Sequence, residues 1–71
     1  MNDEVIELQG TIIECLPKFI FKVELVTSGH NILATTSSKL KMNFIRFLPG
    51  DKVTVEVSPF NLSKGLITWK Y

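Results

Sequence analysis

Strict alternation of apolar and polar residues is the feature that most limits the fold of this chain. From Lys52 to Ser58, three valines occupy every second position, and polar or charged residues fill the positions between them. From Phe19 to Leu25, phenylalanine, valine and leucine recur at every second position, with a lysine and a glutamate among the residues between them. A period of two residues is typical of a strand with one buried face. The sequence therefore predicts a β-sheet protein, with strands at Phe19–Val26 and Lys52–Ser58.

Three further strands follow from the same kind of pattern. Val5 to Ile13 is rich in β-branched residues, and Gly10 interrupts its apolar side. A glycine at such a place suggests a bulge or bend that lets one long strand serve two sheets. Ile32–Thr36 and Leu66–Tyr71 are the predicted third and fifth strands. Proline, glycine and polar residues predict turns or loops at residues 14–17, 27–31 and 59–65.

The segment between the third and fourth strands has helical spacing instead. At about 100° per residue, one side of a helix is shared by Leu40, Phe44, Phe47 and Leu48. Ser38 can cap the start of this short helix, and Pro49 ends it at the latest. The prediction is an all-β fold, a closed five-stranded Greek-key barrel of the oligonucleotide/oligosaccharide-binding (OB) type, with a short helix between strands three and four. An SH3-like barrel is the alternative, and the position of the helix disfavours it.

Length and charge limit the possible functions. A chain of 71 residues forms one domain, and its formal net charge of +1 does not by itself indicate a nucleic-acid binder. The distribution of charge is more informative. Residues 1–35 carry five acids and two lysines, whereas residues 36–71 carry six cations and two acids. The second half is therefore predicted to build a basic face.

Several classes of protein are disfavoured by what the sequence lacks. The single cysteine, Cys15, cannot form an intramolecular disulfide, and no secretory signal is recognisable, so we expect a reducing, cytoplasmic-type compartment. Cys15 is most simply a small apolar filler near a turn. No apolar run approaches the ~20 residues of a membrane span. One histidine and one cysteine predict no zinc site, and no set of residues suggests nucleophilic or acid–base catalysis, so an enzyme is the least supported interpretation.

Two segments carry a resemblance to a known family. Residues 39–46 read Lys-Leu-Lys-Met-Asn-Phe-Ile-Arg, and residues 59–65 read Pro-Phe-Asn-Leu-Ser-Lys-Gly. With Gln9-Gly10-Thr11, Gly29-His30 and Gly50-Asp51-Lys52, they resemble the small bacterial and organellar translation initiation factor one. The resemblance is colinear from about residue 4 to residue 70. Both segments stand at the family's spacing in a chain of the family's length.

The resemblance implies a single OB-fold domain, of the S1-like RNA-binding kind, over residues 1–71. It implies binding to the small ribosomal subunit at the aminoacyl (A) site, through ribosomal RNA and a small-subunit ribosomal protein. It further implies that the protein keeps transfer RNA out of that site and cooperates with the other initiation factors, without catalysis or a cofactor. We expect a monomer that contacts no membrane and works in the cytoplasm, or in an organellar stroma or matrix.

Eight residues are the candidates for RNA binding. Lysine and arginine neutralise phosphates, arginine also stacks on bases, and exposed aromatic rings offer stacking platforms. Histidine and asparagine in loops can contact RNA or read a base edge. The candidates are Lys39, Lys41, Asn43, Phe44, Arg46, Phe60, Lys64 and His30.

Each candidate also has a simpler structural interpretation. A surface cation is by default a solvated charge, and His30 could be a solvated residue in a hairpin tip. Phe44 could be a core residue under the helix, and Asn43 could cap the helix end. Phe60, in a polar loop, is expected to face outward. The binding role and the structural role are both left open at these positions.

Other positions depart from the family or lie outside its motifs. The family usually has arginine where this chain has Leu66, and it carries more cations near the end, so we expect a shallower dependence of RNA affinity on salt. Tyrosine is more usual at positions 44 and 60. Phe21 is expected in the core, and Phe19 either there or near the binding face. Trp69 is expected in the core or at the barrel seam rather than on the binding face.

Two other binding functions are alternatives. A protein-interaction barrel would engage a polypeptide with exposed aromatic residues, and its binding would barely respond to salt. A generic RNA chaperone would resemble the cold-shock domains, which carry phenylalanine-containing motifs on adjacent strands two and three. Residues 18–22 match such a motif only loosely.

Overall fold

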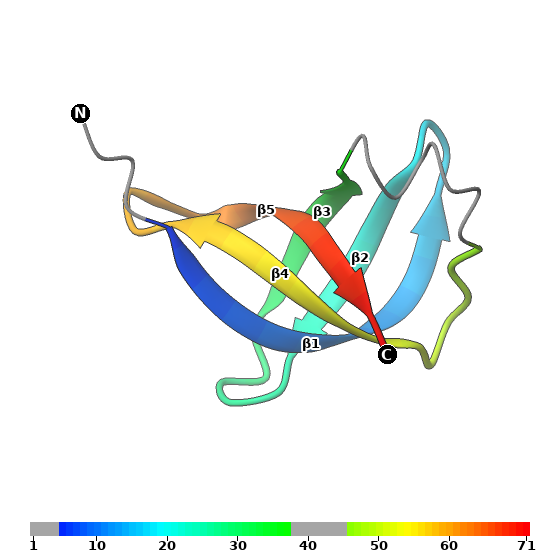
Figure 1. Ribbon diagram of the computed structural model, residues 1–71, viewed down its shortest axis with the longest axis horizontal. Helices are drawn as coiled ribbons and strands as arrows, with labels where there is room; N and C mark the ends of the chain where they lie inside the picture. The colour runs from blue at the N-terminus through cyan, green and yellow to red at the C-terminus, as the bar shows by residue number, and fades with distance from the viewer. Residues whose placement is uncertain (1–4, 38–45) are drawn as a thin grey trace.

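Five strands form a closed barrel in the described part of the chain (Figure 1). The computed structural model describes residues 5–37 and 46–71. In chain order the strands are β1 (Ile6–Leu16), β2 (Ile20–Leu25), β3 (Asn31–Thr36), β4 (Lys52–Ser58) and β5 (Asn61–Lys70). Their order around the barrel is β1-β2-β3-β5-β4, and the β3–β5 pair is parallel whereas the others are antiparallel. The predicted all-β, five-stranded closed barrel is confirmed.

Gly10 is the position at which β1 passes from one neighbour to the other. The first part of β1 pairs with β4 and the second part with β2, and Gly10 has a partner on both sides, Val53 and Leu25. A Cβ atom at Gly10 would lie 2.4 Å from Cγ1 of Val23 and 3.0 Å from the carbonyl oxygen of Glu24. The strand bends here because only glycine allows so close an approach. β1 therefore pairs with two neighbours within one closed barrel, and the register shift that marks a bulge lies between Ile12 and Glu14 rather than at Gly10.

The core consists of inward residues at alternate positions of each strand. In β4, for example, the three valines are buried, and the residues between them face outward. Phe47, from the segment before β4, closes one end of the barrel, where its ring centroid lies 5.2 Å from that of Phe21. The buried apolar residues are Ile12, Phe21, Val23, Leu25, Ile32, Ala34, Phe47, Val53, Val55, Val57 and Ile67.

Two predicted turns are wrong in extent. Residues 14–16 were expected in a turn, but they belong to β1 and pair with residues 20–22 of β2. The chain reverses at residues 17–19 instead, where Lys18 and Phe19 have φ angles of 65° and 59°. The predicted loop at residues 59–65 contracts to Pro59 and Phe60, because β5 already begins at Asn61. Backbone pairing with β2, β3 and β4 overrides the local turn preferences in both places.

The predicted short helix cannot be followed along its length. Residues 38–45 lie outside the described residues, and residues 46–48 carry no regular secondary structure. Phe47 is buried, whereas Leu48 is 53% exposed, so the two do not share one apolar side as the helical spacing predicted. Residues 5–37 and 46–71 contain no helix of the length and apolarity that a membrane crossing requires.

Candidate nucleic-acid interface

The structure describes half of the eight candidate residues. Lys39, Lys41, Asn43 and Phe44 lie outside the described residues. Arg46, His30, Phe60 and Lys64 are described, and all four are exposed. Their positions on the barrel show which of them can meet a common ligand.

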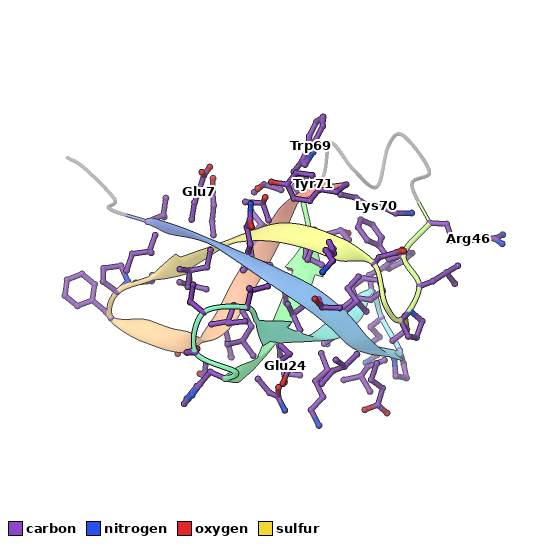
Figure 2. All side chains as sticks on the ribbon, turned by 90° about the horizontal axis from the view of Figure 1, so that it is seen from below. Glu7, Glu24, Arg46, Trp69, Lys70 and Tyr71 are labelled. Atoms are coloured by element: carbon purple, nitrogen blue, oxygen red, sulfur yellow. The ribbon has the colours of Figure 1, made fainter. Side chains whose placement is uncertain are left out.

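Arg46 extends from a segment that is fastened to the end of the barrel. Phe47, which directly follows Arg46, is anchored by its burial in the core. The Nζ atom of Lys70 donates a hydrogen bond to the Arg46 carbonyl. The same ammonium group lies 3.3 Å from Oδ2 of Asp51 and 5.8 Å from the centroid of the Phe47 ring. The Arg46 guanidinium is thus presented from a fixed backbone, while its side chain stays in solvent (Figure 2).

Asp51 fixes the turn that leads from this segment into β4. The Leu48 amide donates a hydrogen bond of 2.8 Å to its carboxylate, and its own amide bonds back to the Leu48 carbonyl at 3.1 Å. Gly50 has a φ of 96°, which glycine adopts without strain. The hydrogen bond from the Leu48 amide is the main cause that lowers the pKa of the Asp51 carboxyl group from its usual value; desolvation opposes it, and the hydrogen bond and charge of Lys70 lower the pKa further.

Phe60 lies at the tip of the β4–β5 turn and is 93% exposed, which confirms that it faces outward. The Phe60 amide donates to Oγ of Ser58 at 3.1 Å. On the other side of the turn, Oδ1 of Asn61 accepts hydrogen bonds from the amide and the hydroxyl of Ser63, at 3.3 and 2.7 Å. These side-chain bonds to nearby backbone stabilise the turn, so the ring is displayed from a defined backbone.

Lys64 belongs to a basic face that also includes Lys22, a residue of the first half of the chain that the sequence analysis did not select. It is the register partner of Leu33 in β3, and Leu33 is in turn the partner of Lys22 in β2. Residues that face each other in a ladder point to the same side of the sheet, so two lysines flank a leucine that is 44% exposed. We call Lys22, Leu33 and Lys64 the basic face. A shallow hollow of about 270 Å³ lies there, lined by Lys22, Asn31, Ile32, Leu33, Ser63 and Lys64.

His30 lies in the β2–β3 turn, directly before the first residue of β3. Its amide donates to Oγ of Ser28 at 3.2 Å, and Gly29 before it has a φ of 71°. The residue borders a separate hollow of about 290 Å³, lined by Leu8, Leu25, Thr27, Ser28, His30 and Val57. Within residues 5–37 and 46–71, no three histidine, cysteine, aspartate or glutamate side chains are grouped so as to hold a metal ion.

The described candidates do not form a single patch. Arg46 lies where β4 begins and β5 ends, whereas Phe60 follows the last residue of β4, at the opposite end of the barrel (Figure 1). β4 has seven residues, which corresponds to about 20 Å at ~3.3 Å per residue. A ligand that contacts both ends must therefore be large and must follow the surface of the barrel.

Two expectations about other residues are wrong. Trp69 is 59% exposed rather than part of the core or a closed seam. Cys15 is exposed, with its sulfur 3.5 Å from the Phe47 carbonyl oxygen, so it does not fill the interior. Phe21 is buried as expected, and Phe19 is 61% exposed, which excludes the core alternative for that ring.

The outer surfaces of β2 and β3 lack the aromatic residues that a cold-shock-like chaperone would place there. Phe21 points inward, and Phe19 lies in the turn before β2. The outward positions of the two strands are held by Ile20, Lys22, Glu24, Asn31, Leu33 and Thr35. This arrangement disfavours the generic chaperone, because stacking on successive bases needs exposed rings.

Comparison with known proteins gives consistent results. The family model described as Translation initiation factor 1A / IF-1 matches residues 1–71. The solution structure of translation initiation factor one from the Wolbachia endosymbiont strain TRS of Brugia malayi matches with a TM-score of 0.75 and 32% sequence identity, over 94% of this chain and 78% of that chain. The crystal structure of YjeQ from Thermotoga maritima matches with a TM-score of 0.74 and 20% identity, over 93% of this chain but 23% of that one, and shows likeness of fold alone.

Proposed function

Because this chain belongs to the translation initiation factor 1A / IF-1 family, we propose that it binds the small ribosomal subunit at the aminoacyl site, through ribosomal RNA, and blocks premature entry of transfer RNA. Its role in translation initiation follows from the family, whose members are non-enzymatic RNA-binding factors. The match of the family model to the entire chain is the observation that carries the proposal.

The distribution of cations and rings is compatible with a large, folded RNA. Lys22 and Lys64 lie on one side of the barrel, Arg46 at one end and Phe60 at the other. No small ligand reaches all of them, whereas ribosomal RNA can surround a domain of this size. Phosphate contacts would supply most of the affinity, and stacking on Phe60 would add about 1–3 kcal/mol.

Lys39, Lys41, Asn43, Phe44 and His30 complete the proposed RNA-binding set. The first four belong to the segment whose sequence resembles the family most specifically. We also propose that a small-subunit ribosomal protein and the other initiation factors are partners, that the protein acts as a monomer, and that it works in the cytoplasm or in an organellar stroma or matrix.

Co-sedimentation with purified small subunits tests the RNA-binding surface. The double variant Lys39→Glu/Arg46→Glu is expected to fold normally and to lose binding, because each substitution replaces an attraction to phosphate with a repulsion. Lys18→Glu/Lys52→Glu changes the net charge by the same amount at exposed lysines outside the proposed set, and it is the matched control. Unchanged binding of the first variant, or equal loss in the control, would refute the assigned surface.

The site of binding needs a separate measurement. Small subunits programmed with messenger RNA and with a filled peptidyl site are titrated with the protein, and binding of aminoacyl-transfer RNA is recorded. Competition between the protein and the transfer RNA is expected if both occupy the aminoacyl site. Simultaneous binding of the two at saturating concentrations would contradict this location.

A further inference from the structure

A second exposed surface lies on the outer side of β1, β4 and β5 and carries different chemistry. Trp69 and Tyr71 are 59% and 65% exposed, and Figure 2 shows both on the side of the barrel that also carries Glu7. Gln9 and Thr54 are register partners beside them, and so are Glu7 and Glu56. We call Glu7, Gln9, Thr54, Glu56, Trp69 and Tyr71 the aromatic-acidic face.

A β-bulge in β5 places Trp69 on this face. Ile67 pairs with Val55 and points inward, so a regular strand would turn the residue two positions later inward as well. The register shifts between Thr54 and Val55, which leaves Thr68 as the extra residue and makes Trp69 the partner of outward-facing Thr54. The bulge therefore exposes an indole that the alternation of the sequence would bury.

Tyr71 is held across the same surface by hydrogen bonds. Its hydroxyl lies 2.9 Å from Oγ1 of Thr54, and Nε2 of Gln9 donates to it at 3.3 Å. Beside the ring is a hollow of about 300 Å³, lined by Gln9, Gly10, Val26, Lys52, Val53 and Tyr71. Two valines and the ring give it apolar walls that suit an aliphatic side chain.

Within residues 5–37 and 46–71, neither Glu7 nor Glu56 forms an ion pair, and the lysine nearest along β4, Lys52, lines the hollow beside Tyr71. Glu7 and Glu56 stand directly opposite each other in the β1–β4 ladder. Like charges in that position repel and destabilise the pair. The one ion pair found in the same part of the chain joins Lys70 to Asp51, near the end of the barrel. A cationic ligand would relieve the repulsion, whereas the phosphates of a nucleic acid would increase it.

We propose that the aromatic-acidic face is a docking surface for a cationic polypeptide segment. An arginine or lysine of the partner lies between Glu7 and Glu56 and against the Trp69 indole, where ionic and cation–π attraction act together. An apolar side chain of the same segment enters the hollow beside Tyr71. The proposal does not depend on RNA binding, because the basic face remains free when this face is occupied.

Nuclear magnetic resonance titration of the isotopically labelled protein tests the proposal with two probes. A short arginine-rich peptide that contains leucine is expected to shift the amide resonances of residues 7, 9, 54 and 56 and the indole resonance of Trp69. A short oligouridine is expected to shift residues 22, 33 and 64 of the basic face instead. The two probes thus report separately on the docking surface and on the RNA-binding function.

Matched variants give the quantitative test. Glu7→Gln/Glu56→Gln is expected to weaken peptide binding about tenfold, because it removes both carboxylates that attract the partner's cation, and Trp69→Ala should weaken it to a similar extent. Glu14→Gln/Glu24→Gln removes the same charge from exposed positions outside the aromatic-acidic face and should change the affinity much less. Equal weakening in this control, peptide shifts spread over all acidic residues, or absence of peptide binding would overturn the proposal. Shifts of Trp69 caused by oligouridine would overturn it in favour of a nucleic-acid ligand.

Discussion

The basic face and the aromatic-acidic face carry opposite chemistry on one shared core. Lys22 and Lys64 flank a leucine on the first, whereas Glu7 and Glu56 oppose each other beside Trp69 on the second. β5 contributes to both faces, because it pairs with β3 through its middle and with β4 along most of its length. The difference teaches that inward positions are fixed by packing, while the outward positions of the same strands are free to serve separate ligands.

The largest effect on stability is expected from a substitution at Gly10, because both faces depend on the barrel backbone that packs closely there. Gly10→Ala places a Cβ atom 2.4 Å from Cγ1 of Val23 and 3.0 Å from a backbone oxygen of β2. We expect the free energy of unfolding to fall by about 2 kcal/mol, because overpacking forces the two strands apart. Urea denaturation followed by tryptophan fluorescence measures this change. Peptide and RNA binding should weaken together as the folded fraction falls.

Gly29→Asn is the control for this prediction. Gly29 also has a special backbone, with a φ of 71°, but no atom lies within 4 Å of the position of an added Cβ. Asparagine tolerates such a φ better than most residues, so only a small loss of stability is expected. If Gly10→Ala were no more destabilising than Gly29→Asn, the close approach of Gly10 to β2 would not be important for the stability of the barrel.

The second prediction separates the faces. Lys22→Gln/Lys64→Gln is expected to weaken oligouridine binding about tenfold and to reduce the slope of log affinity against log salt by ~1.4, since each phosphate contact on a single strand contributes about 0.7. Peptide binding to the aromatic-acidic face should not weaken. The variant Lys18→Gln/Lys52→Gln has the same net charge, and an equal loss of RNA affinity in it would show that only overall charge matters.

Much of the fold could be predicted because it follows from local alternation. The number of strands, the bend at Gly10 and the burial of Val53, Val55 and Val57 all came from the sequence pattern. The extents of β1 and β5 could not, since residues 14–16 and 61–65 resemble turn or loop sequences and become strand only through pairing with distant neighbours. Trp69 was misplaced because one bulged residue, which no local pattern marks, reverses its direction.

The candidate site could be predicted in composition but not in arrangement. Arg46, Phe60 and Lys64 were found from cationic and aromatic residues in family-like segments, and the structure exposes all three. Lys22 was missed because it lies in another strand, and the Lys22–Leu33–Lys64 row exists only once three strands are in register. The opposition of Glu7 and Glu56 likewise requires knowledge of how β1 pairs with β4.

The third prediction concerns pH, which is expected to affect the segment of residues 46–48 but neither of the two faces. The pKa of Asp51 is lowered below its usual value near 3.8, so its interactions stabilise the fold above that pH and are lost as the pH falls through the lower folded value. Acid titration should therefore loosen residues 46–48 while the barrel persists. Amide hydrogen exchange at Leu48 measures the effect, and Asp51→Asn should remove its pH dependence. An unchanged pH dependence in the variant would assign the effect to another group.

The smallest effect is expected from Tyr71→Phe, which sharpens the description of the aromatic-acidic face alone. The substitution removes the hydroxyl that contacts Thr54 and Gln9 but keeps the ring. Because these bonds are exposed to water, the free energy of unfolding should fall by only about 0.5 kcal/mol.

Peptide affinity should fall about twofold in this variant, since the ring is no longer held in place beside the hollow, and oligouridine affinity should not change. Thr68→Ala tests the neighbouring bulge. It removes the Thr68 hydroxyl, which donates to the Thr54 carbonyl at 3.5 Å, and leaves the Tyr71 hydrogen bonds in place. If Tyr71→Phe bound peptide as well as the unmodified protein, the hydrogen bonds that hold the ring would not contribute to peptide binding. If Tyr71→Phe lowered RNA affinity as much as peptide affinity, the two faces would not be independent. The hydroxyl of Tyr71 contacts only β1 and β4, so its loss would then have affected the basic face at a distance.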